Sequence, residues 1–362
     1  MKTKLPSLAI LQVADTGPLD SLVVMLNSVG IFCALPNYLL QGELRRLGCD
    51  SVLSVDDLVR SGSYDPPRET LPIVGPKDME RRDVLFVDIK AQKNHAKVTK
   101  RWPHLAYRQL WYRINGGKPE HVINTKGDHG DEVNPPCPVL TPNQWYGKGW
   151  VDTTTDDNKI FRTNSPCKSY SCWPPFVAIN DYDPSTRWTH SWERPICLVH
   201  NVVGWGYGPL TDKFREMGVA LHGERSPDGL LKHREVPTRL SKCLAYVHLK
   251  ISDAPGYALY EALAAGCPVI CTRKLIWKCR MQELLIPNVT CLVFDKETHA
   301  PFSTEDLVQC EHEVRQHLKD LTSPEYNERI GMAGRQQLTK IMWNEANDKE
   351  SLHEFLTRHY GA

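Results

Sequence analysis

The second half of the chain alternates short apolar runs with stretches that read as helices. Apolar runs occupy residues 195–200, 219–222, 245–249, 268–271 and 290–294, and helical stretches lie between them at 210–217, 236–243, 257–265 and 278–285. Runs this short, spaced regularly by helices, are typical of parallel strands. A parallel sheet needs cover on both faces, which the helices supply. We therefore expect an α/β domain whose ligands bind beyond the carboxyl ends of its strands.

Length and composition indicate two domains. The chain has 362 residues, more than one domain usually holds, and it is 41% hydrophobic and 24% charged, as folded proteins are. A Pro-rich turn at 173–176 precedes the alternating half, so we expect the chain to divide near residues 175–195. In the first half we expect strands at 8–13, 84–89 and 121–124, helices at 19–29 and 38–47, and loop at 153–173.

Cysteine usage and hydropathy indicate a protein of the cytoplasm. Several of the twelve cysteines fall in expected core strands, which indicates reduced thiols rather than a disulfide framework. Cys167 and Cys172 have the spacing of half a zinc site, but no matching pair follows and we interpret them as loop residues. No apolar run approaches the roughly 20 residues of a membrane span.

Residues 253–271, DAPGYALYEALAAGCPVIC, carry the chemistry that is easiest to interpret. Asp253 and Gly256 fall in the loop after the run at 245–249, and Glu261 falls inside the next helix. A loop with Gly at a helix start offers free N–H groups and the positive end of a dipole, which suits a phosphate. A carboxylate just inside the helix can accept hydrogen bonds from ribose hydroxyls, and one in the loop can do the same for a sugar. The pattern favours recognition of a nucleotide-sugar; the alternative is a βαβ unit that packs small residues and binds no ligand.

The segment resembles the acid-x7-acid motif of retaining GT-B glycosyltransferases, usually read as E-G-F-G-L-P-x-L-E-A-M-A-x-G-x-P-V-I. Asp253 takes the place of the first Glu, Gly256 that of the second Gly, and Glu261 that of the second Glu. Pro255 stands where the motif has Phe. The small and apolar positions that follow the pattern are Ala262, Ala264, Gly266, Pro268, Val269 and Ile270.

This resemblance implies a GT-B architecture, in which two Rossmann-like α/β domains face each other across a cleft. We expect an acceptor-side domain at 1–180 and a nucleotide-sugar-binding domain at 181–345. The GT-B pattern sends the end of the chain back to the first domain, so we expect a returning C-terminal helix at 346–362.

The resemblance also implies roles in donor binding. Glu261 would bind the hydroxyls of the ribose. Asp253 would be a catalytic residue and would bind the hydroxyls of the transferred sugar. The phosphates would be held by N–H groups near Gly256, Tyr257 and Ala258. In GT-B enzymes a Gly-containing loop of the first domain faces the donor phosphate, and Thr16 and Gly17 are the candidates here; the alternative is a βα turn whose Gly has no such role.

One departure from the family concerns the cations at the donor phosphates. The family has an Arg and a Lys after the first strand of the second domain, whereas here Asn201 stands at the Arg position and no Lys follows until Lys213. A departing diphosphate needs positive partners. We expect Lys250, three residues before Asp253, to be the catalytic cation, with Arg225 and Arg273 as further candidates.

The acceptor side is best indicated by a basic window at 81–126. It holds eleven Lys and Arg against three acids in a chain of net charge +1. Trp102, Tyr107, Trp111 and Tyr112 lie among them, and cations with aromatics suit a polyanion with stackable bases. The alternative is a solvated basic helix face over core aromatics. Candidate acceptor-binding residues are Lys93, Lys97, Arg101, Arg113 and Asn115.

Two acidic clusters bear on proton transfer and metals. His129, in Asp-His-Gly-Asp-Glu at 128–132, is the candidate general base, although many retaining GT-B enzymes let the leaving phosphate take the proton. Asp181 and Asp183 have the D-x-D form that GT-A enzymes use for a metal, but they fall in the interdomain turn. We expect no essential metal, and no cofactor besides the nucleotide-sugar co-substrate.

The sequence therefore predicts a cytoplasmic retaining glycosyltransferase with UDP-glucose as the default donor. The favoured acceptor is a 5-hydroxymethylpyrimidine in DNA, as for viral base-modifying glycosyltransferases. The likeness to those enzymes is one of role, not of a motif. If the protein is viral, we expect it in the cytoplasm of the host. The alternatives are transfer to a glycan or a lipid-linked sugar, and an epimerase or a non-catalytic nucleotide-sugar binder of the same fold.

Overall fold

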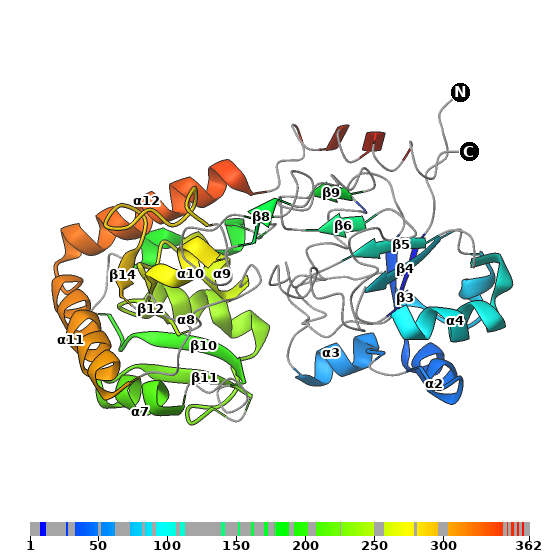
Figure 1. Ribbon diagram of the computed structural model, residues 1–362, viewed down its shortest axis with the longest axis horizontal. Coiled ribbons are helices and arrows are strands. Elements are labelled where there is room, and N and C mark those ends of the chain that lie inside the picture. Colours follow the sequence, from blue (N-terminus) through cyan, green and yellow to red (C-terminus); the bar gives the residue numbers. More distant parts are fainter. Residues whose placement is uncertain are drawn as a thin grey trace. The chain divides into compact units, whose positions relative to one another are not determined.

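The computed structural model of the chain divides into two compact units, Met1–Phe176 with Trp343–Ala362, and Val177–Met342 (Figure 1). The structure describes residues 8–11, 27, 33–49, 52–61, 73–81, 84–88, 92–105, 109–112, 139–141, 151–152, 161–162, 170–172, 177, 179–187, 192–201, 208–224, 226–249, 257–278, 281–295, 303–342, 346, 349–350, 353–354 and 357.

The first unit is built on a seven-stranded sheet. In spatial order its strands are β3 (Ile73–Val74), β2 (Cys33–Pro36), β1 (Leu8–Leu11), β4 (Val84–Asp88), β5 (Gln109–Tyr112), β6 (Val139–Thr141) and β9 (Tyr170–Cys172). All neighbours run parallel, and the chain reverses its direction of growth between β1 and β4, as in Rossmann folds. A separate antiparallel pair joins β7 (Val151–Asp152) to β8 (Phe161–Arg162).

The expectation of loop at 153–173 is wrong, because β8 and β9 lie within it. Both strands are only two or three residues long, too short to show an alternating pattern in the sequence. Strand β9 is defined instead by its pairing with β6.

Helices of the first unit are anchored by local caps and apolar faces. They are α2 (Tyr38–Arg46), α3 (Val55–Ser61) and α4 (Gln92–Arg101), with 3-10 turns η1 (Asp78–Arg81) and η3 (Pro103–Leu105). Asn37 caps α2, since its Oδ1 accepts a hydrogen bond from Leu40 N at 2.9 Å. Leu40 and Leu44, one turn apart, are buried on the inner face of this helix.

The second unit is a five-stranded parallel sheet. Its spatial order is β11 (Ala220–Glu224), β10 (Ile196–Asn201), β12 (Tyr246–His248), β13 (Val269–Thr272) and β14 (Leu292–Phe294). These are the five apolar runs that the sequence predicts as strands. In this doubly wound order the switch point lies between β10 and β12, where such sheets bind their ligands.

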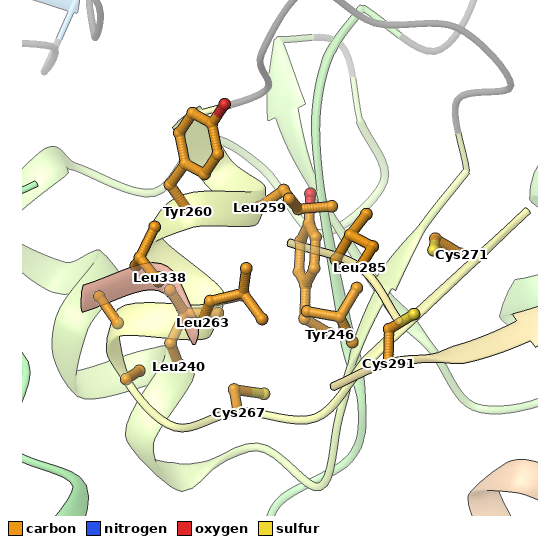
Figure 2. Close-up of a cluster of buried hydrophobic side chains, with 14 of the residues drawn as sticks. Leu240, Tyr246, Leu259, Tyr260, Leu263, Cys267, Cys271, Leu285, Cys291 and Leu338 are labelled. Carbon is orange, nitrogen blue, oxygen red and sulfur yellow. The ribbon is translucent and has the colours of Figure 1, made fainter. Parts of the chain in front are cut away.

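Successive residues of these strands face two separate cores. Tyr246 packs in one apolar cluster and its neighbour Val247 in the other. The first cluster is covered by α8 (Val236–Lys242) and α9 (Tyr257–Ala264), and the second by α7 (Gly208–Glu216) and α11 (Thr304–Asp320) (Figure 1). Figure 2 shows Leu259 and Leu263 of α9 beside Tyr246 within the first cluster.

The remaining elements are α10 (Arg273–Lys278), α12 (Pro324–Ile341) and the 3-10 turns η5 (Ile179–Asp181), η6 (Pro184–Arg187) and η8 (His233–Glu235). The helix expected at 278–285 is wrong, since α10 precedes it and residues 282–284 form a turn. Helix α10 begins directly after β13 because Thr272 Oγ1 accepts a hydrogen bond from Leu275 N at 3.1 Å and caps it.

Helix α12 packs directly against the end of α9. Gly266 has φ +66°, and the N–H groups of Gly266 and Cys267 bond the carbonyls of Leu263 and Ala262, which closes α9 with a Schellman motif. A Cβ on Gly331 of α12 would overlap the carbonyl oxygen of Gly266. The small residues of the sequence motif therefore serve close helix packing as well as any ligand.

Among the helices that the structure describes, none is both long and apolar enough to cross a membrane.

Candidate functional site

Helix α9 follows the switch-point strand β12, and a narrow stripe of its surface is partly exposed to solvent. Its residues are buried except for Tyr257, Ala258 and Glu261, which keep partial exposure. Leu259 and Leu263 fix the opposite side of the helix in the core. The three open positions are those that the sequence predicts for donor binding on this helix.

The carboxylate of Glu261 is held at one of its two oxygens. Tyr182 donates its phenolic hydrogen to Oε1 at 2.9 Å, and His233 Nε2 lies 3.3 Å from the same oxygen. The side chain of Glu261 is 13% exposed. Within the part of the chain that the structure describes, no group hydrogen-bonds Oε2 of Glu261.

Arg335 of α12 ties the segment of Tyr182 to helix α9. Its guanidinium donates to Tyr182 O at 2.7 Å, to Ile179 O at 3.3 Å and to Ala264 O at the end of α9. Burial lowers the pKa of Arg335, while the charge of Asp183 acts against that shift. A cation at the carboxyl end of α9 also complements the helix dipole.

Neither Tyr182 nor His233 was found by reading the sequence. The Asp181-x-Asp183 pattern drew attention to the two acids, yet it is the residue between them that reaches Glu261. Asp183 caps its own turn, accepting from Ser185 N at 2.9 Å and from Ser185 Oγ at 2.8 Å. Among the described residues, no group of three His, Cys, Asp or Glu could hold a metal ion, and the absence of an essential metal stays a prediction.

Several predicted site residues lie outside the described residues: Thr16, Gly17, Arg113, Asn115, His129, Arg225, Lys250, Asp253 and Gly256. Asn201 ends strand β10 and Lys93 lies in α4, but only their backbones are described. The roles assigned to all of these residues stay predictions.

Two cations considered for the donor phosphates have carboxylate partners. Lys213 Nζ lies 3.0 Å from Glu216 and 3.2 Å from Glu311, and hydrogen bonds to these carboxylates raise the pKa of Lys213. Arg273 Nε lies 2.6 Å from Asp295 Oδ1. Their charges are therefore partly neutralised within the second unit.

The described part of the basic window is tied into the first unit. Lys97 Nζ donates to Gly48 O, and Arg101 Nε donates to Glu43 Oε1 at 3.0 Å. Trp102 is a core residue, 2% exposed, and so it offers no stacking surface. These contacts join α4 to α2 and its C-terminal turn, and the buried Trp102 fits the alternative of a basic helix face over core aromatics.

The chain resembles known proteins in its backbone fold rather than in its sequence. No protein-family model matches the chain, and no curated protein sequence does. Among solved structures, Anabaena HepE in complex with UDP and glucose has a TM-score of 0.63 at 11% identity, covering 98% of this chain and 100% of that one. Sucrose-phosphate synthase from Thermosynechococcus elongatus has a TM-score of 0.59 at 13% identity, covering 98% and 99%.

A third similar structure is an alpha-glucosyltransferase in complex with UDP-glucose and DNA containing an abasic site. Its TM-score is 0.54 at 10% identity, covering 97% of this chain and 99% of that one. These neighbours are GT-B proteins, and the likeness spans the whole chain. The chain has the GT-B fold. The fold class predicted from the acid-x7-acid motif is confirmed, and at these identities the likeness concerns the backbone rather than the site.

Proposed function

We propose that the protein is a glycosyltransferase that binds a nucleotide-sugar donor on its second unit. The observation that carries this proposal is the placement of Glu261, a held and partly exposed carboxylate on the helix that follows the switch-point strand of a GT-B fold. Such a carboxylate suits the vicinal hydroxyls of a ribose. A βαβ unit without a ligand would have no need to anchor an acid at this position.

The remaining donor contacts come from the sequence motif. Asp253 would bind the sugar hydroxyls, and the N–H groups of Gly256, Tyr257 and Ala258 would bind the phosphates. Lys250, with Arg225, would stabilise charge on the departing diphosphate.

In the reaction, the bond between the anomeric carbon and the donor phosphate oxygen breaks, and the acceptor oxygen takes its place on that carbon. The acceptor proton leaves with the nucleoside diphosphate or with His129. We infer from the motif that the anomeric configuration is retained.

UDP-glucose is the donor we propose first. HepE was solved with UDP and glucose, and the alpha-glucosyltransferase with UDP-glucose, and both share the fold of this chain. An identity of 10–11% makes this a starting point for a donor panel.

For the acceptor we propose a 5-hydroxymethylpyrimidine in DNA. Two observations favour it: the basic excess at 81–126, and the fold shared with a transferase solved with DNA. The contacts of Lys97 and Arg101 within the first unit count against it, because a cation with a partner gains less from a phosphate. Glycans and lipid-linked sugars are the acceptors to examine next.

The test is incubation with UDP-, ADP- or GDP-glucose and DNA containing 5-hydroxymethylcytosine or 5-hydroxymethyluracil, followed by digestion to nucleosides and mass spectrometry. A hexose increment on the modified nucleoside supports both donor class and acceptor. Release of nucleoside diphosphate without that increment contradicts the DNA acceptor and directs the search to glycans. Donor turnover that needs no acceptor at all would instead indicate an epimerase or a hydrolase.

A further inference from the structure

The two oxygens of the Glu261 carboxylate differ in their contacts with the described residues. A carboxylate oxygen has room for about two hydrogen bonds and can only accept them. Oε1 accepts a hydrogen bond from Tyr182 Oη at 2.9 Å, and His233 Nε2, 3.3 Å away, forms an ion pair with it when the imidazole is protonated, so both partners lie at Oε1. No described residue hydrogen-bonds Oε2. We propose that Tyr182 and His233 are positioning residues that occupy Oε1 of Glu261 and thereby present Oε2 to the hydroxyls of a ribose.

Tyr182 is well fixed for this task. Its residue is 3% exposed, and its backbone oxygen accepts from Arg335 at 2.7 Å. The same guanidinium binds the carbonyl of Ala264, three residues after Glu261 on α9. The phenol and the carboxylate are therefore held to one another through the backbone as well as through their own hydrogen bond.

His233 comes from a closed turn. Glu235 Oε2 accepts a hydrogen bond from Lys232 N at 2.9 Å, which brackets His233 within η8. Helix α8 follows at once, and its Leu240 packs in the same core cluster as Leu259 and Leu263 of α9. The imidazole thus approaches Glu261 from an element that is already packed on the same helix.

This inference rests on the proposed function, because it assumes that the ligand is a ribonucleotide. A glutamate loses rotamer freedom when it binds a ligand, and anchoring one oxygen beforehand removes most of that cost. An anchored Oε2 also has a fixed direction, so it can distinguish a ribose from a ribose that lacks one hydroxyl. The anchors should therefore act on specificity for the sugar of the nucleotide rather than on affinity alone.

The experiment is calorimetric titration of the full chain with UDP and with 2′-deoxy-UDP. We expect the wild-type protein to prefer UDP by about tenfold or more, the size of a hydrogen bond to a charged group. Tyr182→Phe and His233→Ala should each reduce that preference by about threefold or more. His233→Gln, which keeps an N–H donor, should restore part of it. The matched control is Tyr326→Phe on α12, whose ring contacts Arg329 instead, and it should keep the wild-type preference.

The ratio of the two affinities separates positioning from a merely structural role. If both affinities fall by the same factor in Tyr182→Phe and His233→Ala, the ratio is unchanged and the inference is overturned. If the wild-type protein binds neither UDP nor ADP nor GDP, the proposed function itself fails. Should Tyr182→Phe not fold, the comparison of His233→Ala with His233→Gln gives the same decision.

Discussion

At the scale of the residue, Arg335 joins segments of the candidate site that are far apart in the sequence. Its three carbonyl partners belong to η5, to Tyr182 and to the end of α9. Arg335→Met would leave these carbonyls without their donor, and we expect the free energy of unfolding to fall by about 2–3 kcal/mol. Urea titration measures this loss. Arg329→Met, on the same helix, removes only a contact with the ring of Tyr326 and should cost well under half as much; equal losses would contradict the role given to Arg335.

The contribution of Asp228 to the stability of the fold depends on pH. Its carboxylate accepts from Leu221 N at 2.8 Å and from Arg194 at 2.6 Å. Burial acts to raise the pKa of Asp228, but these hydrogen bonds and the charge of Arg194 hold it below its ordinary value. Because the pKa is lower in the folded state, the stabilisation is complete above the unfolded pKa of about 3.9 and is lost as pH falls through the folded pKa.

We therefore expect Asp228→Asn to be less stable than the wild-type protein at neutral pH and to approach it in acid. The difference in unfolding free energy, measured by urea titration at several pH values, should shrink as pH falls below about 4. A difference that stays constant with pH would mean that the charge of Asp228 contributes nothing.

Only some residues of the candidate site could be predicted from the sequence. Glu261 was predictable because its partners in the motif are neighbours in the chain. Tyr182 lies 79 residues from Glu261, and no local pattern links the two. Tyr182 follows η5 and His233 lies in η8, and only the tertiary fold brings their side chains to Glu261.

At the scale of the element, helix α12 packs closely against the turn that ends α9. Gly331→Ala would place a methyl group against the carbonyl of Gly266, and overpacking of this kind costs about 3 kcal/mol. Gly42→Ala in α2 is the matched control, because a Cβ there meets nothing within 4 Å. It should stabilise the protein by about 0.5–1 kcal/mol through helix propensity. Thermal or urea unfolding of both variants tests the packing; an unaffected Gly331→Ala would refute it.

Helices and strands could be predicted where their buried positions form a regular apolar pattern in the sequence. The five strands of the second unit are buried on both faces, so each appears as an apolar run. Helix α10 was misplaced because its start depends on one hydrogen bond at Thr272 rather than on periodicity. Strand β9 was missed because pairing with β6, not composition, makes it a strand.

At the scale of the whole molecule, charge is distributed unevenly. The chain has net charge +1, while residues 81–126 carry an excess of eight positive charges. If this window binds DNA, Lys93→Glu with Lys100→Glu should weaken binding to a duplex and flatten its dependence on salt by about one unit of slope per lost phosphate contact. Fluorescence anisotropy at several salt concentrations measures both.

Lys97 and Arg101 are left unchanged in that variant because they hold α4 to neighbouring backbone and side chains. The control is Lys319→Glu with Lys340→Glu, two exposed positions of the second unit. Equal binding by both double variants would remove the case for a nucleic acid acceptor.

The fold as a whole was predictable from one motif and one alternating pattern, although solved structures with the same fold are only 10–13% identical. The alternating pattern predicts the parallel sheet of the second half, whereas the doubly wound strand order of each sheet comes from the structure. What the fold leaves open is the ligand, which depends on a few side chains at the switch point.

The most direct test of the account is calorimetric titration of UDP into the wild-type protein and into Glu261→Ala, with Glu328→Ala on the exposed side of α12 as control. We predict that the wild-type and Glu328→Ala proteins bind UDP alike, and that Glu261→Ala binds it at least about tenfold more weakly while its unfolding transition is retained. Equal binding by all three proteins would contradict the assignment of the donor site to Glu261.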